Sequence, residues 1–187
     1  MNDNYEHFRQ FMVGFTAAAE LHQRAAKRGS LVECVCLGAS VIDAALRVGL
    51  VLQHQLNTGT TEIERELVIQ EQSDRPIGER EIYRRAKDSG LIDDELFNLI
   101  TALYNDRNRV IHRYVISRIT TAEVFIIATS YESAFGKVSA VVGELELRQI
   151  QSGIGMTKAG PEFDRASLEA LADEKHTPEF GVLLRGS

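Results

Sequence analysis

The sequence contains no tryptophan, only three prolines and only two cysteines among its 187 residues. Two cysteines cannot form the disulfide framework of a small secreted protein, and a domain of this length buries a full core without one. Cys34 and Cys36 would lie about 200° apart on a helix, so they cannot bond to each other. The five histidines are scattered without metal-ligand spacing. The sequence therefore predicts a cytoplasmic protein with no metal and no other cofactor.

Neither positive nor negative charge is in large excess. Lysine and arginine total 21, aspartate and glutamate total 27, and the formal net charge at pH 7 is −6. Apolar residues make up 44% of the chain, as in ordinary soluble globular proteins. This balance does not favour attraction of the whole molecule to nucleic acid or to an anionic membrane, so binding to either would need a local basic patch.

The chain also lacks a long hydrophobic run that is free of charges. Its most apolar stretch, Leu31 to Leu52, contains Glu33, Asp43 and Arg47. Each of these charges would cost about 2.5–3.5 kcal/mol at the centre of a bilayer. At the N-terminus, acidic residues precede any apolar run, so no signal peptide is expected. We interpret the stretch as a central core helix and expect no membrane partner.

Apolar residues recur at spacings of three and four along most of the chain, which predicts helices. Gly29 and Ser30 are typical of a junction between two helices, and Asp93 and Asp94 are typical of a helix start. The expected helices cover residues 4–28, 31–55, 79–89, 94–114 and 122–151. No βαβ rhythm and no phosphate-binding loop is present. We therefore predict an all-α fold, an antiparallel bundle of four to five helices.

Two segments lie outside this pattern. Residues 60–78 are polar except for one short apolar run, and they form an insert that is a strand, a short helix or a covering loop. Towards the C-terminus, several glycines and prolines indicate a linker. We expect a helical domain over residues 1–152 and a flexible or loosely packed tail over residues 153–187, with one weak helix from Ser167 to Glu174.

The most informative helix is the one predicted over residues 94–114. On a helical wheel, Arg107 lies in the centre of an apolar stripe. The stripe consists of Leu96, Ile100, Leu103, Val110, Ile111 and Tyr114. A buried guanidinium keeps its charge, so Arg107 needs a carboxylate, an anionic ligand or a wet crevice. It is either a core arginine paired with an acid of a neighbouring helix or part of a functional site.

Other polar residues of this helix surround Arg107. Asn108 and His112 form an i, i+4 pair on one flank of the stripe, whereas Arg109 and Arg113 face solvent. Together with Arg107, they indicate a polar pocket at an otherwise dry seam between helices.

The second predicted helix supplies acidic residues that can face this pocket. Its polar stripe contains Glu33, Ser40, Asp43, Arg47 and His54. Asp43 and Arg47 are spaced to form an i, i+4 ion pair on a narrow solvated face. Alternatively, Glu33 or Asp43 orients Arg107 or His112.

The string Arg107-Asn108-Arg109-Val110-Ile111-His112 fits the pattern Arg-Asn-x-x-x-His. In this motif, near the C-terminal end of a late bundle helix, the chain resembles the HEPN superfamily (higher eukaryotes and prokaryotes nucleotide-binding). The stretch from Gly90 to Glu95 is similar to the family's lead-in to that helix. Tyr114 completes the Arg-x4-His-x-Tyr form found in HepT-like toxins. The resemblance covers roughly residues 31–151.

The resemblance implies a metal-independent RNA endonuclease in which two protomers place their motifs around a shared cleft. Such cleavage needs a base for the 2′-hydroxyl, an acid for the leaving 5′-oxygen and positive charge near the phosphorane. His112 suits the role of base or acid, Arg107 can stabilise the phosphorane, and Asn108 can hold the imidazole or the phosphate. Since one chain supplies one such histidine, acid and base would come from two copies of a homodimer.

In HepT-like toxins, the tyrosine of this pattern is a target for nucleotidylation by a partner nucleotidyltransferase antitoxin. The resemblance therefore implies a toxin–antitoxin or phage-defence setting, with Tyr114 at the matching position and such an antitoxin as a partner. The chain departs from the compact HepT-like proteins by residues 60–78 and by its C-terminal tail, and the helical wheel places Tyr114 in the apolar stripe.

An RNA partner needs a basic footprint. Between Arg75 and Arg118 there are nine lysines and arginines and seven acids, a local excess of +2 within a chain of −6. Arg109 and Arg113 are the expected RNA contacts in this span. Aromatic residues make up only 7% of the chain, so a stacking platform for single-stranded RNA is not expected.

Two other functions stay open. A non-catalytic HEPN-like helical regulator or protein-interaction module, similar to the mannitol operon repressor family, would suit the acidic composition. In that case Arg107 binds a nucleotide or a partner carboxylate, or is a paired core residue. DNA binding through a helix-turn-helix over residues 79–114 is less consistent with the pattern, because its second helix would have to bury the apolar stripe and still reach the bases.

Overall fold

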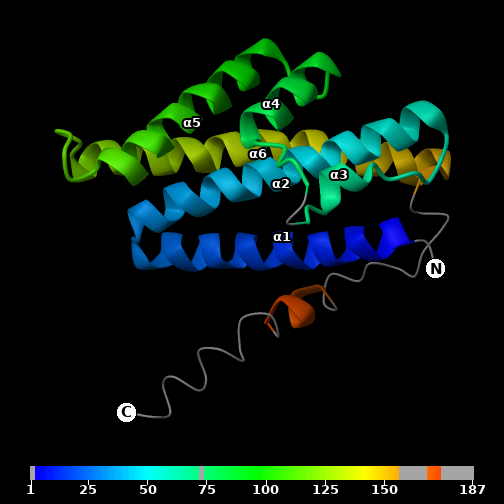
Figure 1. Ribbon diagram of the computed structural model, residues 1–187, viewed down its shortest axis with the longest axis horizontal. Coiled ribbons are helices and arrows are strands. Elements are labelled where there is room, and N and C mark those ends of the chain that lie inside the picture. The colour runs from blue at the N-terminus through cyan, green and yellow to red at the C-terminus, as the bar shows by residue number, and fades with distance from the viewer. Residues whose placement is uncertain (1–2, 72–73, 156–167, 174–187) are drawn as a thin grey trace, which may run out of the picture.

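The structure, a computed structural model, describes residues 3–71, 74–155 and 168–173 and contains helices and no strands in these ranges (Figure 1). The helices are α1 (Asp3–Arg28), α2 (Leu31–Thr58), α3 (Arg65–Val68), α4 (Glu79–Asp88), α5 (Asp94–Arg113) and α6 (Thr121–Ser152). The all-α class is confirmed, and each of the five expected helices is present to within one turn at either end.

The central helix of the bundle is α2, which contacts each of the other five. It runs antiparallel to α1, as expected for helices joined by a short turn (Figure 1). It runs parallel to α6, because Gly38 faces Tyr131 and Gly49 faces Val142. The expected antiparallel arrangement therefore holds for consecutive long helices but not for this pair, since the chain from α3 to α5 returns to the end at which α2 begins.

The length and apolar composition of α2 would suffice to cross a membrane. In the bundle, 61% of its most apolar window is buried. Val35, Ile42 and Leu46 have no exposed surface at all, and they pack among residues of the other helices. This burial is what we expect of a core helix, because a helix that is apolar on nearly all sides must be surrounded by other parts of the protein.

Local side-chain caps set the starts of α5 and α6. The carboxylate of Asp93 accepts a hydrogen bond from the backbone N–H of Leu96 at 2.8 Å. Thr120 and Glu123 form a reciprocal capping box at the start of α6, in which each side chain accepts from the backbone N–H of the other residue. Such caps satisfy backbone donors that have no partner within the helix. The Asp93 cap fixes the end of the turn that joins α4 to α5, and the Thr120 cap fixes the end of the loop that joins α5 to α6.

The insert over residues 60–78 contains the short helix α3, one of the three alternatives that the sequence left open. Arg47 holds this segment: its guanidinium donates to the backbone oxygens of Leu67 and Ile77 at 3.2 and 2.9 Å. The same guanidinium pairs with Asp43 at 2.7 Å. The expected i, i+4 pair of Asp43 and Arg47 is confirmed, but it lies beneath the insert rather than on a solvated face.

A turn of helix at residues 168–173 falls within the weak helix expected from Ser167 to Glu174. It lies against α1: the side chain of Ala172 is fully buried, and Arg24 of α1 donates to Asp173 at 3.2 Å. The rest of the expected tail after residue 155 lies outside the described residues.

Candidate functional site

The motif helix α5 is held between α4 and α6 by its apolar face. Leu96, Ile100, Leu103 and Val110 are buried on this face, as the helical wheel predicts. The hydroxyl of Tyr131 on α6 donates to the backbone oxygen of Leu103 at 2.8 Å, in a buried position. A buried hydrogen bond of this kind is costly to break, so it fixes the rotation of α5 and with it the direction of the motif side chains.

Arg107 points into the seam between α5 and α4. Its side chain is 18% exposed and forms an ion pair with Glu79, the first residue of α4, with 2.5 Å between Nη2 and Oε2. The guanidinium carbon also lies 5.0 Å from the centre of the Tyr104 ring, one helical turn earlier. The arginine in the apolar stripe thus has the carboxylate that burial requires, and that carboxylate belongs to a neighbouring helix.

The surroundings of this pair are largely buried. Tyr83 and Tyr131 have almost no exposed surface, and burial raises the pKa of both phenols. Burial also raises the pKa of Glu79 above its ordinary value, while the positive charge of Arg107 opposes the rise and the nearby carboxylate of Asp43 adds to it. Glu79 is therefore an acid in a partly buried site, and Arg107 is the main group that favours its ionised form.

Asn108 and His112 lie on the other side of the motif, in an open groove along α5. The groove has a volume of about 600 Å³. It is lined by Tyr104, Asn105, Asp106, Asn108, Arg109, His112 and Arg113. Asn108 is half-buried and His112 is exposed. The structure therefore divides the motif: one amide and one imidazole face the groove, and the guanidinium of Arg107 turns inward.

The two arginines expected to contact RNA both line this groove. Arg109 is half exposed and pairs with Asp106 at 3.3 Å and, more distantly, with Glu123 at 3.9 Å. Arg113 is exposed and makes no ion pair within the described part of the chain. Arg109 is weakly paired, Arg113 is unpaired in the described part of the chain, and both lie beside His112. The groove therefore has positive charge that can bind an anion.

The acids expected to support the site take other partners. Glu33 pairs with Arg28 at the turn between α1 and α2, at 3.2 Å, and Asp43 pairs with Arg47. The structure places neither carboxylate on Arg107 or on His112. Nothing in the sequence pattern connects Glu79 with the motif. Its only local signal is its place in the first turn of a short helix, where acids are common.

Tyr114 does not lie in the buried stripe as the helical wheel predicts. It is 43% exposed, and Ile111 one turn earlier is exposed as well. The wheel assumes that a neighbouring helix covers the stripe to its end, but α5 ends at Arg113 and α6 begins only at Thr121. The last apolar residues of the stripe therefore have no helix to pack against in the single chain.

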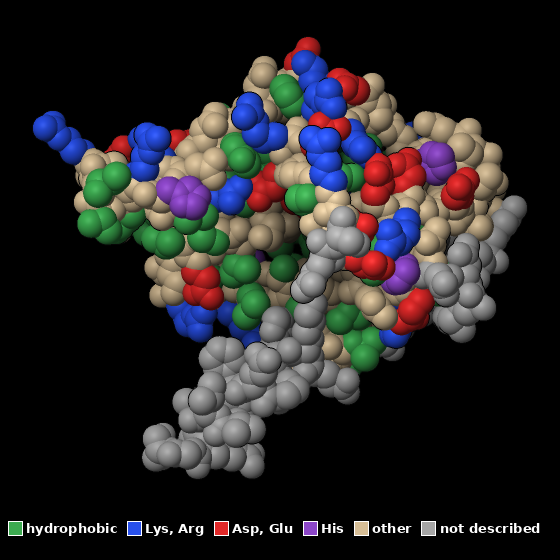
Figure 2. All heavy atoms as spheres, in the orientation of Figure 1, with side chains coloured by type: hydrophobic (Ala, Val, Ile, Leu, Met, Phe, Trp, Pro, Cys, Tyr) green, Lys and Arg blue, Asp and Glu red, His purple; other side chains and the backbone are tan. Residues whose placement is uncertain are grey.

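These side chains belong to a larger exposed surface, here called the apolar end patch. It consists of Ile111, Tyr114, Val115, Ile116, Phe125 and Ile126. Val115 and Ile116 are 93% and 83% exposed. Figure 2 shows apolar side chains grouped at the end where α5 meets α6. Exposed apolar surface of this extent is typical of an interaction site, and it lies within one helical turn of His112.

In the described residues no group of three or more histidine, cysteine, aspartate or glutamate side chains is arranged to hold a metal ion. Comparison of the chain with models of known protein families, with curated proteins and with solved structures finds no match. The function of the chain is therefore inferred from the site itself.

Proposed function

We propose that the chain is a metal-independent RNA endonuclease with a HEPN-like fold, active in the cytoplasm as a homodimer in a toxin–antitoxin or phage-defence setting. One observation carries this proposal. Asn108 and His112 share an open groove with Arg109 and Arg113, and Arg107 lies on the same helix with its guanidinium on Glu79. This arrangement gathers an acid–base group, an amide and guanidinium groups, which are the groups that phosphodiester cleavage needs.

The reaction assigned to this groove is an intramolecular transesterification. A base removes the proton of the 2′-hydroxyl, the oxygen attacks phosphorus, and the bond to the 5′-oxygen breaks as an acid protonates it. His112 supplies one of the two proton-transfer groups, because an exposed imidazole can reach a bound strand. The His112 of a second copy supplies the other, so that the dimer holds base and acid together.

Arg107 stabilises the phosphorane in this scheme. Its Nε–H is buried and has no hydrogen-bond partner among the described residues, so the guanidinium retains a donor beyond those used by Glu79. When the phosphorane binds, it takes the place of the Glu79 carboxylate at the guanidinium of Arg107. One anion replaces another, so little additional desolvation of the guanidinium is needed. Glu79 then acts as the group that holds Arg107 in place between turnovers.

The apolar end patch supports the homodimer. A two-fold axis near the patch would cover its side chains with the same side chains of a second copy and bring two His112 residues to one cleft. Tyr114 lies within the patch and is exposed, so its hydroxyl is accessible in the single chain. This supports the nucleotidyltransferase-type antitoxin as a partner that modifies the free protomer.

The test is cleavage of total RNA and of tRNA by the purified protein in EDTA, beside the variant Arg107→Ala/His112→Ala. We expect cleavage by the wild type and none by the variant. His54→Ala is the matched control, because His54 lies in another cavity, beside Glu64 and Arg85, and should leave cleavage unchanged. Absence of cleavage by the wild type, or equal cleavage by the double variant, would contradict the proposal.

One observation favours a second candidate, a non-catalytic HEPN-like regulator or protein-interaction module. The charge of Arg107 is already compensated by Glu79, as in a structural ion pair. In this case the apolar end patch binds a partner protein, and the same assay would show no cleavage by the wild type.

A further inference from the structure

A second groove lies next to the motif groove, between α4 and α5. It also has a volume of about 600 Å³. Arg80, Arg84, Phe97, Thr101 and Tyr104 contribute to its lining, together with the backbone turn at Gly78. Tyr104 lines both grooves, so the two adjoin at this residue.

Tyr104 brings two guanidinium groups together. The guanidinium carbon of Arg107 lies 5.0 Å from the ring centre, and that of Arg80 lies 5.7 Å from the same centre. Each contact lies within the range of an attractive cation–π interaction. The aromatic ring therefore serves as a support for arginine side chains, and it links the motif arginine to the neighbouring groove.

The positive charge in this second groove is not fully compensated. Arg84 is paired with Glu81 at 2.7 Å, and Glu79 is taken up by Arg107. Arg80 is exposed and has no ion pair in the described part of the chain. Lysine and arginine side chains gather over α4 on the face shown in Figure 2, with acidic side chains among them, in a chain whose net charge is −6.

We propose that the α4–α5 groove binds the phosphodiester backbone of the RNA strand that flanks the cleaved bond. Arg80 and Arg84 contact phosphates, and Tyr104 keeps Arg80 beside Arg107 so that neighbouring phosphates are held together. The role of this strand as a substrate rests on the proposed endonuclease function, whereas binding of the strand does not require cleavage. Recognition through phosphates makes the groove a determinant of strand length and not of base sequence.

The chemistry of the groove favours a nucleic-acid backbone over an acidic peptide. Guanidinium groups bind carboxylates and phosphates in a bidentate manner, but an RNA strand offers phosphates at regular spacing to Arg80 and Arg107, which contact the same ring. The groove also adjoins the motif groove at Tyr104, and the proposed reaction takes place in that motif groove on the same strand. Binding should therefore show the salt dependence of phosphate contacts.

The test is binding of a single-stranded 2′-O-methyl RNA of about twelve nucleotides, measured by fluorescence anisotropy over a series of salt concentrations. This RNA lacks the attacking hydroxyl and stays intact. We expect Arg80→Gln/Arg84→Gln to bind about tenfold more weakly. The negative slope of log K for binding against log salt should become shallower by about 1.4, the value for two lost phosphate contacts. Arg80→Lys/Arg84→Lys keeps both charges and should keep most of the slope.

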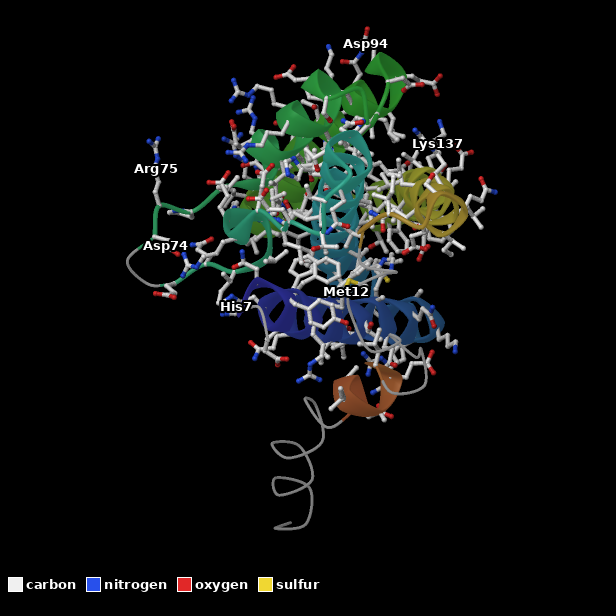
Figure 3. All side chains as sticks on the ribbon, turned by 90° about the vertical axis from the view of Figure 1, so that its right-hand side faces the viewer. His7, Met12, Asp74, Arg75, Asp94 and Lys137 are labelled. Atoms are coloured by element: carbon white, nitrogen blue, oxygen red, sulfur yellow. The ribbon has the colours of Figure 1, made fainter. Side chains whose placement is uncertain are left out.

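The matched control is Lys137→Gln/Arg148→Gln, which removes the same charge from α6. Lys137 lies on the opposite side of the molecule from Arg75 (Figure 3). This control should bind RNA like the wild type. Circular dichroism of every variant checks that each is folded.

Cleavage of a long RNA and of a dinucleotide separates the groove from the endonuclease function. If the protein cleaves RNA, Arg80→Gln/Arg84→Gln should raise KM for the long RNA by a larger factor than KM for the dinucleotide, because only the long strand extends into the α4–α5 groove. If the wild type binds RNA with the expected salt dependence but cleaves none, the groove proposal is supported and the endonuclease function is contradicted. If the variant binds like the wild type, or if the wild type binds no RNA, the groove proposal is overturned, whatever the cleavage assay shows.

Discussion

The carboxylate of Glu79 and the guanidinium of Arg107 form an ion pair that joins the first turn of α4 to the motif helix α5. Twenty-eight positions separate the two residues along the chain. The pair is partly buried, so its removal leaves a charge with little access to water. It links the stability of the bundle to the orientation of the motif.

The contribution of Glu79 to the free energy of unfolding should decrease as pH rises, which is the opposite of the usual behaviour of an acid in an ion pair. Burial raises the pKa of Glu79, so the folded state binds a proton more tightly than the unfolded state. The free energy of unfolding of the wild type, relative to Glu79→Gln, should therefore decrease as pH rises from the ordinary pKa of a glutamate through the raised one. Urea unfolding of both proteins from about pH 4 to about pH 8 measures this difference.

Both proteins in this comparison keep Asp43 and Arg107, so their contributions largely cancel in the difference. A difference that stays constant over the range, or that grows in favour of the wild type as pH rises, would show that Arg107 and not burial dominates the pKa of Glu79.

The apolar end patch should hold two copies together. Val115→Asp/Ile116→Asp places two charges on its most exposed residues, and a dimer that buries them would dissociate. We expect the wild type to be a dimer by light scattering and the variant to be a monomer that keeps the helical circular-dichroism spectrum of the wild type. RNA cleavage should decrease when the dimer is lost, because each protomer supplies only one His112.

Leu147→Asp/Ile150→Asp is the matched control for this prediction. These two apolar residues are 58% and 62% exposed, but they lie near the opposite end of α6. The control should remain a dimer. Loss of the dimer in both variants, or a monomeric wild type, would place the self-association elsewhere or rule it out.

The parts of the site that the sequence could predict are those that depend on local interactions. Asp93 and Thr120 cap their helices through hydrogen bonds to residues three positions away, so the helix starts follow from the sequence alone. The 3.6-residue period likewise places Arg107 at the seam. These signals need no knowledge of the packing.

The parts that could not be predicted depend on how distant elements pack. Glu79 meets Arg107 only because α4 folds back against α5, and a second-helix acid such as Asp43 suits the sequence pattern equally well. Tyr114 shows the opposite case. Its wheel angle is right for burial, but the helix ends before any neighbour can cover it.

The capping box at the start of α6 should contribute measurable stability. In Thr120→Ala the backbone N–H of Glu123 loses its acceptor, which should lower the free energy of unfolding by about 1 kcal/mol. Ser30→Ala is the control, because Ser30 precedes α2 and makes no side-chain capping hydrogen bond. Its effect should stay within about 0.5 kcal/mol in the same urea titration. Equal effects of the two substitutions would contradict a stabilising capping box.

α2 packs closely against α6 at Gly38, and this position should not tolerate a larger residue. A Cβ atom there would lie 2.9 Å from the Cβ of Tyr131, which is fixed to the backbone and cannot rotate away. Gly38→Ala should therefore push the two helices apart and lower the free energy of unfolding by about 1–3 kcal/mol, despite the better helix propensity of alanine.

Gly136→Ala provides the matched substitution within α6. A Cβ at this exposed position meets no atom within 4 Å, so the change should stabilise the protein by about 0.5–1 kcal/mol through helix propensity alone. The two substitutions should thus shift the urea midpoint in opposite directions. Because Tyr131 also bonds to Leu103 of the motif helix, Gly38→Ala should reduce RNA cleavage as well, whereas Gly136→Ala should not. A stabilised Gly38→Ala would show that α2 and α6 are not packed this closely.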